Sequence, residues 1–146
     1  MEFCTAVNCM DGRVQIPVIS YLKERFKVDY VDVVSEAGPN RILADGLDDQ
    51  LLESIWARVE ISISQHDSKG VAVIGHHDCA GNPVGESEQR LHTAAAVRRV
   101  RDRFAAVPVI GLWVDHNWEV SELPLESARQ QGRLTALPDH CGCCLR

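Results

Sequence analysis

Apolar residues recur along the chain in two spacings, one typical of buried strands and one typical of helices. Short apolar or β-branched runs occupy residues 3–9, 30–35, 71–74 and 107–114, with a shorter run at 118–120. Apolar residues lie three and four positions apart over residues 16–26 and 52–63, and turn residues at 81–85 precede a further helix predicted over 86–104. Because short runs suit strands and the 3.6-residue period suits helices, the pattern predicts strands that alternate with helices.

This alternation predicts an α/β fold in a single domain. Strands joined by helices form a parallel sheet with right-handed crossovers and with helices on both faces. We expect a mostly parallel four-stranded sheet in the order 2-1-3-4, to which residues 118–120 add a short antiparallel fifth strand. The pattern weakens beyond Pro124. Residues 1–122 are therefore predicted to form the domain, and residues 123–146 a C-terminal extension with a cysteine-rich tail.

Length, apolar run length and charge argue against a membrane-spanning, exported or nucleic-acid-binding protein. A chain of 146 residues is long enough to bury an apolar core without disulfide bonds. Its longest apolar runs are far shorter than the roughly 18 residues that span a bilayer, and no charged-then-apolar leader opens it, so we expect an unexported, cytoplasmic protein without a membrane partner. The net charge is −6, and the one basic cluster, at residues 98–103, is interpreted as the solvated face of a helix rather than a nucleic-acid site.

The six cysteines indicate metal or thiol chemistry rather than a disulfide framework, because they are bunched along the chain. Cys4, in the middle of a predicted strand, is expected to be a small buried hydrophobe. The tail contains a histidine and three thiols within five residues, and its role stays open between metal binding or oxidation and an incidentally cysteine-rich terminus. These tail residues are His140, Cys141, Cys143 and Cys144.

Metal-ligand residue types directly follow two of the predicted strands. The first strand runs into residues 9–13 (CMDGR) and the third into residues 75–79 (GHHDC). In a parallel sheet, ligands collect beyond the carboxyl ends of the strands where the strand order reverses, so the two segments meet if strands one and three are neighbours. Cys9, His76 and Cys79 would then fill three corners of a tetrahedron, which is the ligand set that zinc prefers.

The fourth corner separates a catalytic site from a structural one. A catalytic zinc leaves this corner to water, whereas a structural zinc is closed by a protein ligand. Asp11 is the nearest candidate for either role, because its carboxylate can accept from water at the metal or bind the metal itself. Arg13, two positions further along, can hold that carboxylate ionised and oriented through a bidentate pair. The spacing thus makes Asp11 and Arg13 the candidate catalytic residues.

Two motifs together resemble the zinc-site signature of the β-class carbonic anhydrases: Cys9-x-Asp11-x-Arg13 and Gly75-His76-x-x-Cys79. The likeness covers roughly residues 3–120 and indicates a small, divergent member. It implies that both cysteines and the histidine bind zinc, that the aspartate accepts from water at the metal, and that the arginine is its partner. It also implies hydration of carbon dioxide to bicarbonate by a homodimer or larger assembly whose pocket is lined from both subunits.

The chain departs from the family signature at Gly12, where the family usually has serine, and at Ala80, where it commonly has glycine. Two other functions stay open. One is hydrolysis of carbonyl sulfide or carbon disulfide, which are linear molecules isoelectronic with carbon dioxide. The other is a non-catalytic zinc-binding or thiol-sensing protein whose fourth corner is filled by Asp11 or a tail cysteine.

Two further polar residues lie between the expected ligands. His77 could relay protons, but a histidine beside a ligand is more often solvated or bonded to a carbonyl. Asp78 is interpreted as a turn residue rather than as an acceptor that orients a ligand.

Overall fold

Strands and helices alternate along the chain as the apolar spacing predicts. The computed structural model describes residues 1–124. Its strands are β1 (Phe3–Cys9), β2 (Tyr30–Glu36), β3 (Val71–His76), β4 (Val109–Val114) and β5 (Val120–Glu122). Its helices are α1 (Gly12–Phe26), α2 (Pro39–Asp45), α3 (Asp49–His66) and α4 (Glu86–Arg103).

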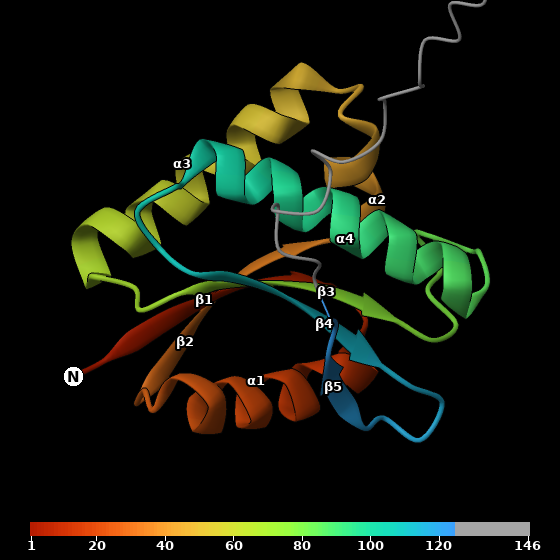
Figure 1. The fold of residues 1–146 in the computed structure, drawn as a ribbon, viewed down its shortest axis with the longest axis horizontal. Helices are drawn as coiled ribbons and strands as arrows, with labels where there is room; N and C mark the ends of the chain where they lie inside the picture. Colours follow the sequence, from red (N-terminus) through yellow and green to blue (C-terminus); the bar gives the residue numbers. More distant parts are fainter. Residues whose placement is uncertain (125–146) are drawn as a thin grey trace, which may run out of the picture.

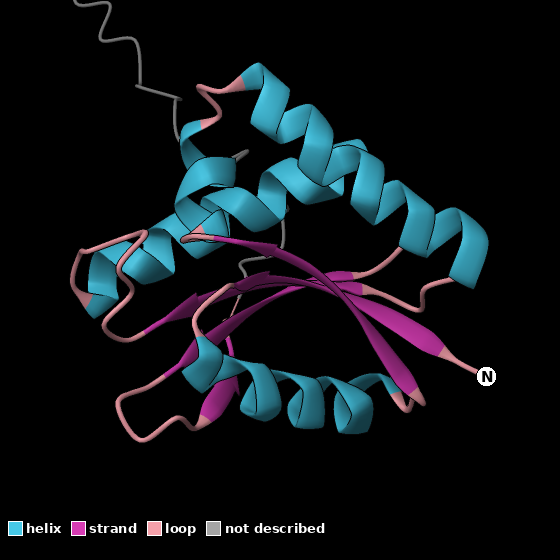
Figure 2. Ribbon diagram, turned by 180° about the vertical axis from the view of Figure 1, so that it is seen from behind, coloured by secondary structure: helices cyan, strands magenta, loops and turns pink. Residues whose placement is uncertain are grey.

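The five strands form one sheet in the order β2-β1-β3-β4-β5. The first four are parallel, and β5 pairs antiparallel with β4. The predicted fold class, strand order and antiparallel fifth strand are therefore confirmed. Helix α1 covers one face of the sheet, and α2, α3 and α4 cover the other (Figure 1). The same three layers are visible from behind (Figure 2).

Each face of the sheet has its own apolar core. On one face, side chains of α3 and α4 pack against alternate residues of the central strands, and on the other face α1 does so. Cys4 is fully buried in the core beneath α1, as predicted. Burial, assisted by the negative charge of Asp32, raises the pKa of Cys4 to about 12, so this thiol stays protonated and unreactive.

Helix α1 begins four residues before the predicted start at residue 16, because Asp11 caps it. The Asp11 carboxylate accepts a hydrogen bond from the backbone N–H of Arg13 at 2.9 Å, which satisfies a donor that the helix leaves free. Pro17 lies inside this helix. Arg13 consequently lies in the first turn of a helix, not in an extended loop.

Two other segments also differ from the expected pattern. No helix was predicted between the strand at 30–35 and the apolar residues from 52 onward, but Gly38 caps the short helix α2 and Pro39 begins it, a position where proline's missing N–H costs no hydrogen bond. The last strand starts at Val120 rather than at residue 118, because Trp118 adopts a left-handed backbone conformation with φ 63° in the turn.

Among the described residues, no helix is long and apolar enough to cross a bilayer. The arginines of the basic cluster at residues 98–103 lie on α4 and are exposed to solvent. Arg101 donates to the carbonyl of Val109 at 2.8 Å, and the Arg103 guanidinium lies over the Phe104 ring.

Of the predicted extension at residues 123–146, the structure describes residues 123 and 124, and Leu123 is buried and donates to the carbonyl of Gly111 at 2.8 Å. Residues 125–146 lie outside the described part.

Candidate metal centre

The sheet opens at the carboxyl ends of β1 and β3. The paired register of these strands ends at Val7 and Val73, although β1 continues to Cys9 and β3 to His76. The strand order reverses here, because the chain leaves β1 for β2 on one side and later returns to β3 on the other. Such a crevice is where ligands bind in open α/β sheets.

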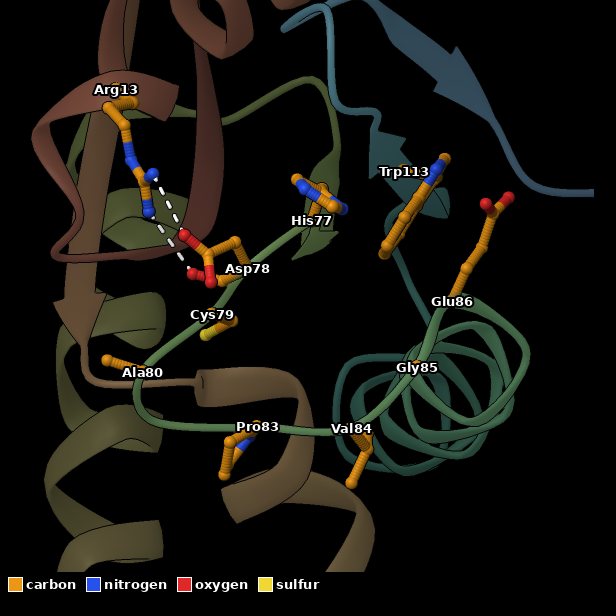
Figure 3. A pocket seen from close by; sticks show the side chains of 10 residues that line it. All are labelled: Arg13, His77, Asp78, Cys79, Ala80, Pro83, Val84, Gly85, Glu86 and Trp113. Atoms are coloured by element: carbon orange, nitrogen blue, oxygen red, sulfur yellow. Dashed lines mark hydrogen bonds and ion pairs between the residues drawn. The ribbon is translucent and has the colours of Figure 1, made fainter.

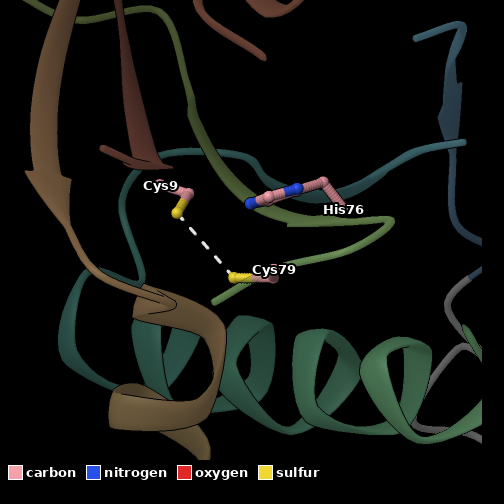
Figure 4. Close-up of side chains that lie close together, drawn as sticks. All are labelled: Cys9, His76 and Cys79. Carbon is pink, nitrogen blue, oxygen red and sulfur yellow. Dashed lines mark hydrogen bonds between the residues drawn. The ribbon is translucent and has the colours of Figure 1, made fainter. Parts of the chain in front are cut away.

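Three metal-ligand side chains converge in this crevice. The donor atoms of Cys9, His76 and Cys79 lie within 4.8 Å of one another, and all three residues are buried. The two sulfur atoms are 3.8 Å apart (Figure 4). A disulfide requires about 2.05 Å, whereas two sulfurs bound at about 2.3 Å to one tetrahedral zinc are about 3.8 Å apart. The spacing of the thiols therefore fits a shared zinc ion.

The imidazole of His76 is oriented for a metal by its own backbone neighbour. His76 Nδ1 lies 2.8 Å from the carbonyl oxygen of His77, which can only accept, so Nδ1 carries the proton. The other nitrogen, Nε2, is buried and has no hydrogen-bond partner among the described residues. Figure 4 shows the ring extending toward the two sulfurs. A buried nitrogen that faces two thiols and has no hydrogen-bond partner among the described residues is suited to complete the donor set once a metal displaces its proton.

The pKa values of the two thiols are shifted in opposite directions. A hydrogen bond from Cys79 lowers the pKa of Cys9, and the imidazole of His76 and the backbone N–H groups of Gly38 and Asp11 lower it further. The same hydrogen bond and the charge on Cys9 raise the pKa of Cys79, as does burial. The metal-free pair therefore favours a single negative charge, and a divalent cation between the sulfurs would stabilise both thiolates.

Glycines let the two loops around the site pack against each other. A Cβ atom at Gly38 would lie 2.6 Å from the carbonyl carbon of Gly81, and one at Gly81 would lie 2.3 Å from that of Ala37. Gly38 also has φ 64°, which favours glycine. The backbone N–H of Gly38 also donates to Cys9, so the loop after β2 is part of the site. Sequence reasoning did not include this loop, although its Gly-Pro-Asn sequence directly after a strand could have indicated it.

Buried amide side chains from α2 and α4 form a hydrogen-bond network against the end of β3. Asn40 of α2 donates to Gln89 Oε1 at 2.7 Å and to Thr93 Oγ1 at 3.1 Å, and Gln89 donates to the carbonyl of Asn82 at 2.7 Å. A Cβ atom at Gly75 would lie 2.5 Å from Thr93 Oγ1, so the strand before His76 rests directly on this network. Sequence reasoning missed these residues.

Asp11 and Arg13 form the bidentate pair that their spacing predicts. Arg13 donates from Nη2 to Asp11 Oδ2 at 2.7 Å and from Nε to Oδ1 at 3.0 Å. These hydrogen bonds lower the pKa of Asp11 to about 2, so the carboxylate is ionised at neutral pH. Asp11 is not a member of the metal-ligand cluster that the described residues form. The pair therefore lies beside the cluster and leaves a fourth position free of this carboxylate.

Gln15 fixes the backbone between Cys9 and Asp11. Its side-chain amide donates to the carbonyl of Cys9 at 2.7 Å and to the carbonyl of Asp11 at 2.8 Å. Because both residues project from this short segment, the amide holds the thiol and the carboxylate in a fixed relation. Sequence reasoning missed this residue as well.

A Gln15→Leu substitution should weaken zinc binding by roughly 10- to 100-fold, because it removes both donors from the segment that carries Cys9. Competition with a chromophoric chelator measures the dissociation constant. The matched control is Gln65→Leu, since the exposed amide of Gln65 donates only to Ser64 among the described residues. An unchanged zinc affinity in Gln15→Leu would exclude a role for the amide in metal binding.

A cavity of about 470 Å³ adjoins Cys79 (Figure 3). Its polar lining residues are Arg13, His77, Asp78 and Glu86, the last of which lies beside Trp113. The apolar lining residues are Ala80, Pro83, Val84 and Trp113. His77 also lies 6.1 Å from His116, ring centre to ring centre. The predicted tail residues His140, Cys141, Cys143 and Cys144 lie outside the described part of the chain.

Comparisons with known proteins identify the family of the chain and structures with its fold. The model of a protein family described as putative carbonic anhydrase matches residues 1–124. A search of the curated proteins gives no match.

Solved structures share the fold. One is β-carbonic anhydrase isoform I of the protozoan Trichomonas vaginalis, with a TM-score of 0.55 and 18% identity over 82% of this chain and 80% of that one. A tetrameric β-carbonic anhydrase of the filamentous ascomycete Sordaria macrospora has a TM-score of 0.56 and 15% identity over 87% and 82%. A carbon disulfide hydrolase in its apo form has a TM-score of 0.56 and 10% identity over 93% and 85%.

Proposed function

Because the chain belongs to the putative carbonic anhydrase family, we propose that it hydrates carbon dioxide to bicarbonate with one zinc ion held by Cys9, His76 and Cys79. The observation that carries the proposal is the convergence of the three donor atoms within 4.8 Å of one another, beside an aspartate paired with an arginine. Cys9, His76 and Cys79 would hold the zinc ion, which would supply Lewis-acid chemistry for the activation of water.

The role of Asp11 follows from its charge. With a pKa of about 2, its carboxylate is a weak base at neutral pH, so it orients water by accepting a hydrogen bond and does not keep the proton. Arg13 fixes the direction of this acceptor through two parallel hydrogen bonds. Hydration of one carbon dioxide by one water yields bicarbonate and one proton, and the proton passes to solvent.

The cavity beside Cys79 supports a small, apolar, linear substrate. Pro83, Val84 and Trp113 form an apolar wall, which suits carbon dioxide because the molecule has no net dipole. Arg13 also lines the cavity, together with the carboxylates of Asp78 and Glu86, and Arg13 is already paired with Asp11 and Asp78. The support for the substrate therefore rests on the apolar residues of the lining.

An Asp11→Asn variant should retain zinc and lose roughly 100-fold in kcat/KM for carbon dioxide hydration, because the neutral amide is a poorer acceptor. Asparagine remains a good helix cap, so α1 should stay intact. The control is Asp48→Asn, at the residue that caps α3 in the same way. Stopped-flow measurement with a pH indicator gives the rates. If the zinc-loaded wild-type protein is no faster than buffer at any pH tested, carbonic anhydrase activity is excluded.

A second candidate is hydrolysis of carbon disulfide or carbonyl sulfide. The support is the likeness in fold to a carbon disulfide hydrolase, together with a cavity wall that equally suits linear sulfur compounds. Sulfide release by the same zinc-loaded protein separates this activity from carbon dioxide hydration. A protein that holds zinc and turns over none of the three substrates would instead be the non-catalytic zinc protein.

We further propose a homo-oligomer that acts in the cytoplasm. The support for assembly is the tetrameric state of the Sordaria macrospora enzymes and the exposed edge strand β2, where Tyr30 and Val33 remain 50% and 38% exposed. The support for a reducing compartment is that Cys4, Cys9 and Cys79 are all free thiols.

A further inference from the structure

Arg13 is held by more partners than its pairing with Asp11 requires. Besides its bonds to Asp11, the guanidinium donates from Nη1 to the carboxylate of Asp78 and from Nη2 to the Asp78 carbonyl, both at 3.1 Å (Figure 3). Its central carbon also lies 4.6 Å from the centre of the Trp118 ring. The start of α1, the loop after β3 and the turn before β5 therefore meet at one side chain.

Both additional partners have a left-handed backbone conformation. Asp78 has φ 55° and Trp118 has φ 63°. Aspartate tolerates this region, but a bulky aromatic residue there is an outlier. Such conformations persist only where their surroundings enforce them, and they cluster at functional sites.

The turn before β5 enforces the conformation of Trp118. The Asp115 carboxylate accepts from the backbone N–H groups of Asn117 at 2.8 Å and Glu119 at 3.0 Å, and the N–H of Trp118 donates to the Asp115 carbonyl at 3.0 Å. The indole also packs against the apolar core on the α1 side. The hairpin therefore holds the ring against Arg13.

Asp11 has a carboxylate, which is a metal-ligand type, two residues beyond the ligand Cys9. Because it is two residues beyond Cys9, its carboxylate can reach a metal in the cluster only by leaving Arg13. While it is paired with Arg13, it lies outside the cluster. Asp78 and Trp118 restrain the guanidinium through a charge-assisted hydrogen bond and a cation–π contact that do not involve Asp11.

We propose that Asp78 and Trp118 are positioning residues that lock Arg13 and thereby keep Asp11 out of the fourth metal position. This proposal rests on the proposed function, because it takes the cluster of Cys9, His76 and Cys79 as a metal site. Neither positioning residue touches the reacting atoms. Their effect is to keep the fourth position available to water and substrate.

The lock is tested in the metal-free protein by NMR of the Arg13 Nε–H group, assigned with an Arg13→Lys variant. Asp78→Asn removes the negative charge that faces Arg13, Trp118→Asn removes the aromatic ring, and asparagine tolerates the left-handed backbone. We expect the exchange of this N–H with water to become at least about tenfold faster in each variant. Asp67→Asn is the control, because Asp67 is also left-handed, at φ 52°, and lies at the end of α3. Unchanged exchange in both variants would overturn the lock.

The open position is tested in the cobalt-substituted protein, whose visible spectrum reports azide binding at the metal. We expect Asp78→Asn to bind azide at least about tenfold more weakly than wild type, because Asp11 then competes for the position. Adding Asp11→Ala should restore azide binding. Equal affinity in Asp78→Asn and wild type would contradict the proposal. A wild-type protein that takes up no cobalt would contradict the proposed function, while the exchange measurement still decides whether Arg13 is locked.

Discussion

A Cys79→Ser variant should lose one equivalent of bound zinc per chain while its metal-free fold keeps nearly its original stability. Serine is close to cysteine in shape, but its hydroxyl does not ionise at neutral pH and cannot replace a thiolate ligand. We expect zinc affinity to fall by more than about 100-fold, the upper end of the loss caused by removing an outer partner of a ligand. The free energy of unfolding without metal should change by less than about 1 kcal/mol, because the backbone N–H groups of Gly81 and Asn82 that donate to the Cys79 sulfur can donate to the hydroxyl instead.

Cys4→Ser is the matched control, which should lower the stability of the fold and leave the zinc content unchanged. Cys4 is fully buried in an apolar core, so a hydroxyl there should lower the free energy of unfolding by about 1–3 kcal/mol. Its zinc content should equal that of wild type. Elemental analysis after gel filtration gives zinc per chain, and urea titration with excess chelator gives the stability. A Cys79→Ser protein that retains the full zinc complement would show that Cys79 is not a ligand.

A Gly81→Ser variant should lose both stability and the metal centre. The added Cβ would lie 2.3 Å from the carbonyl carbon and 2.5 Å from the carbonyl oxygen of Ala37, and backbone atoms cannot rotate away as a side chain can. The loops after β2 and β3 would have to separate. We expect a loss of about 3 kcal/mol in the free energy of unfolding, the upper end for overpacking, together with weaker zinc binding.

Gly85→Ser provides the control within the same loop. A Cβ at Gly85 would meet no heavy atom within 4 Å, and its φ of −68° suits any residue. Gly85 caps α4, where serine is at least as favourable as glycine, so stability should stay within about 0.5 kcal/mol of wild type. Thermal unfolding with and without zinc measures both variants. Equal stability of Gly81→Ser and Gly85→Ser would mean that the loops do not require their close contact.

The sequence was sufficient to predict the sheet and the convergence of the metal-ligand residue types. Strand and helix spacing fixed the order of the elements, and Cys9 and His76 each end a strand, where topology brings them together. The start of α1 was missed because the cap formed by Asp11 depends on one local hydrogen bond. Helix α2 was missed because a Gly-Pro-Asn sequence also suits a loop.

The buried hydrogen-bond network next to the metal-ligand residues could not be predicted from the sequence. Asn40 and Gln89 are 49 positions apart and meet only after α2 and α4 have packed on the same face of the sheet. A polar residue on a helix is usually solvent-facing, so nothing in the spacing marks these as buried. Gly12 is not required by sterics, because a Cβ there would meet nothing within 4 Å.

The close contact of Gly38 and Gly81 bears on which ions the crevice can select. The loops that carry Cys79 and touch Cys9 are braced against each other, with the sulfurs already 3.8 Å apart. An ion that demands square-planar or octahedral coordination would have to force these loops open, whereas a tetrahedral ion would not. We therefore expect rigidity to favour zinc and cobalt over copper and nickel, even though intrinsic binding strength ranks copper highest.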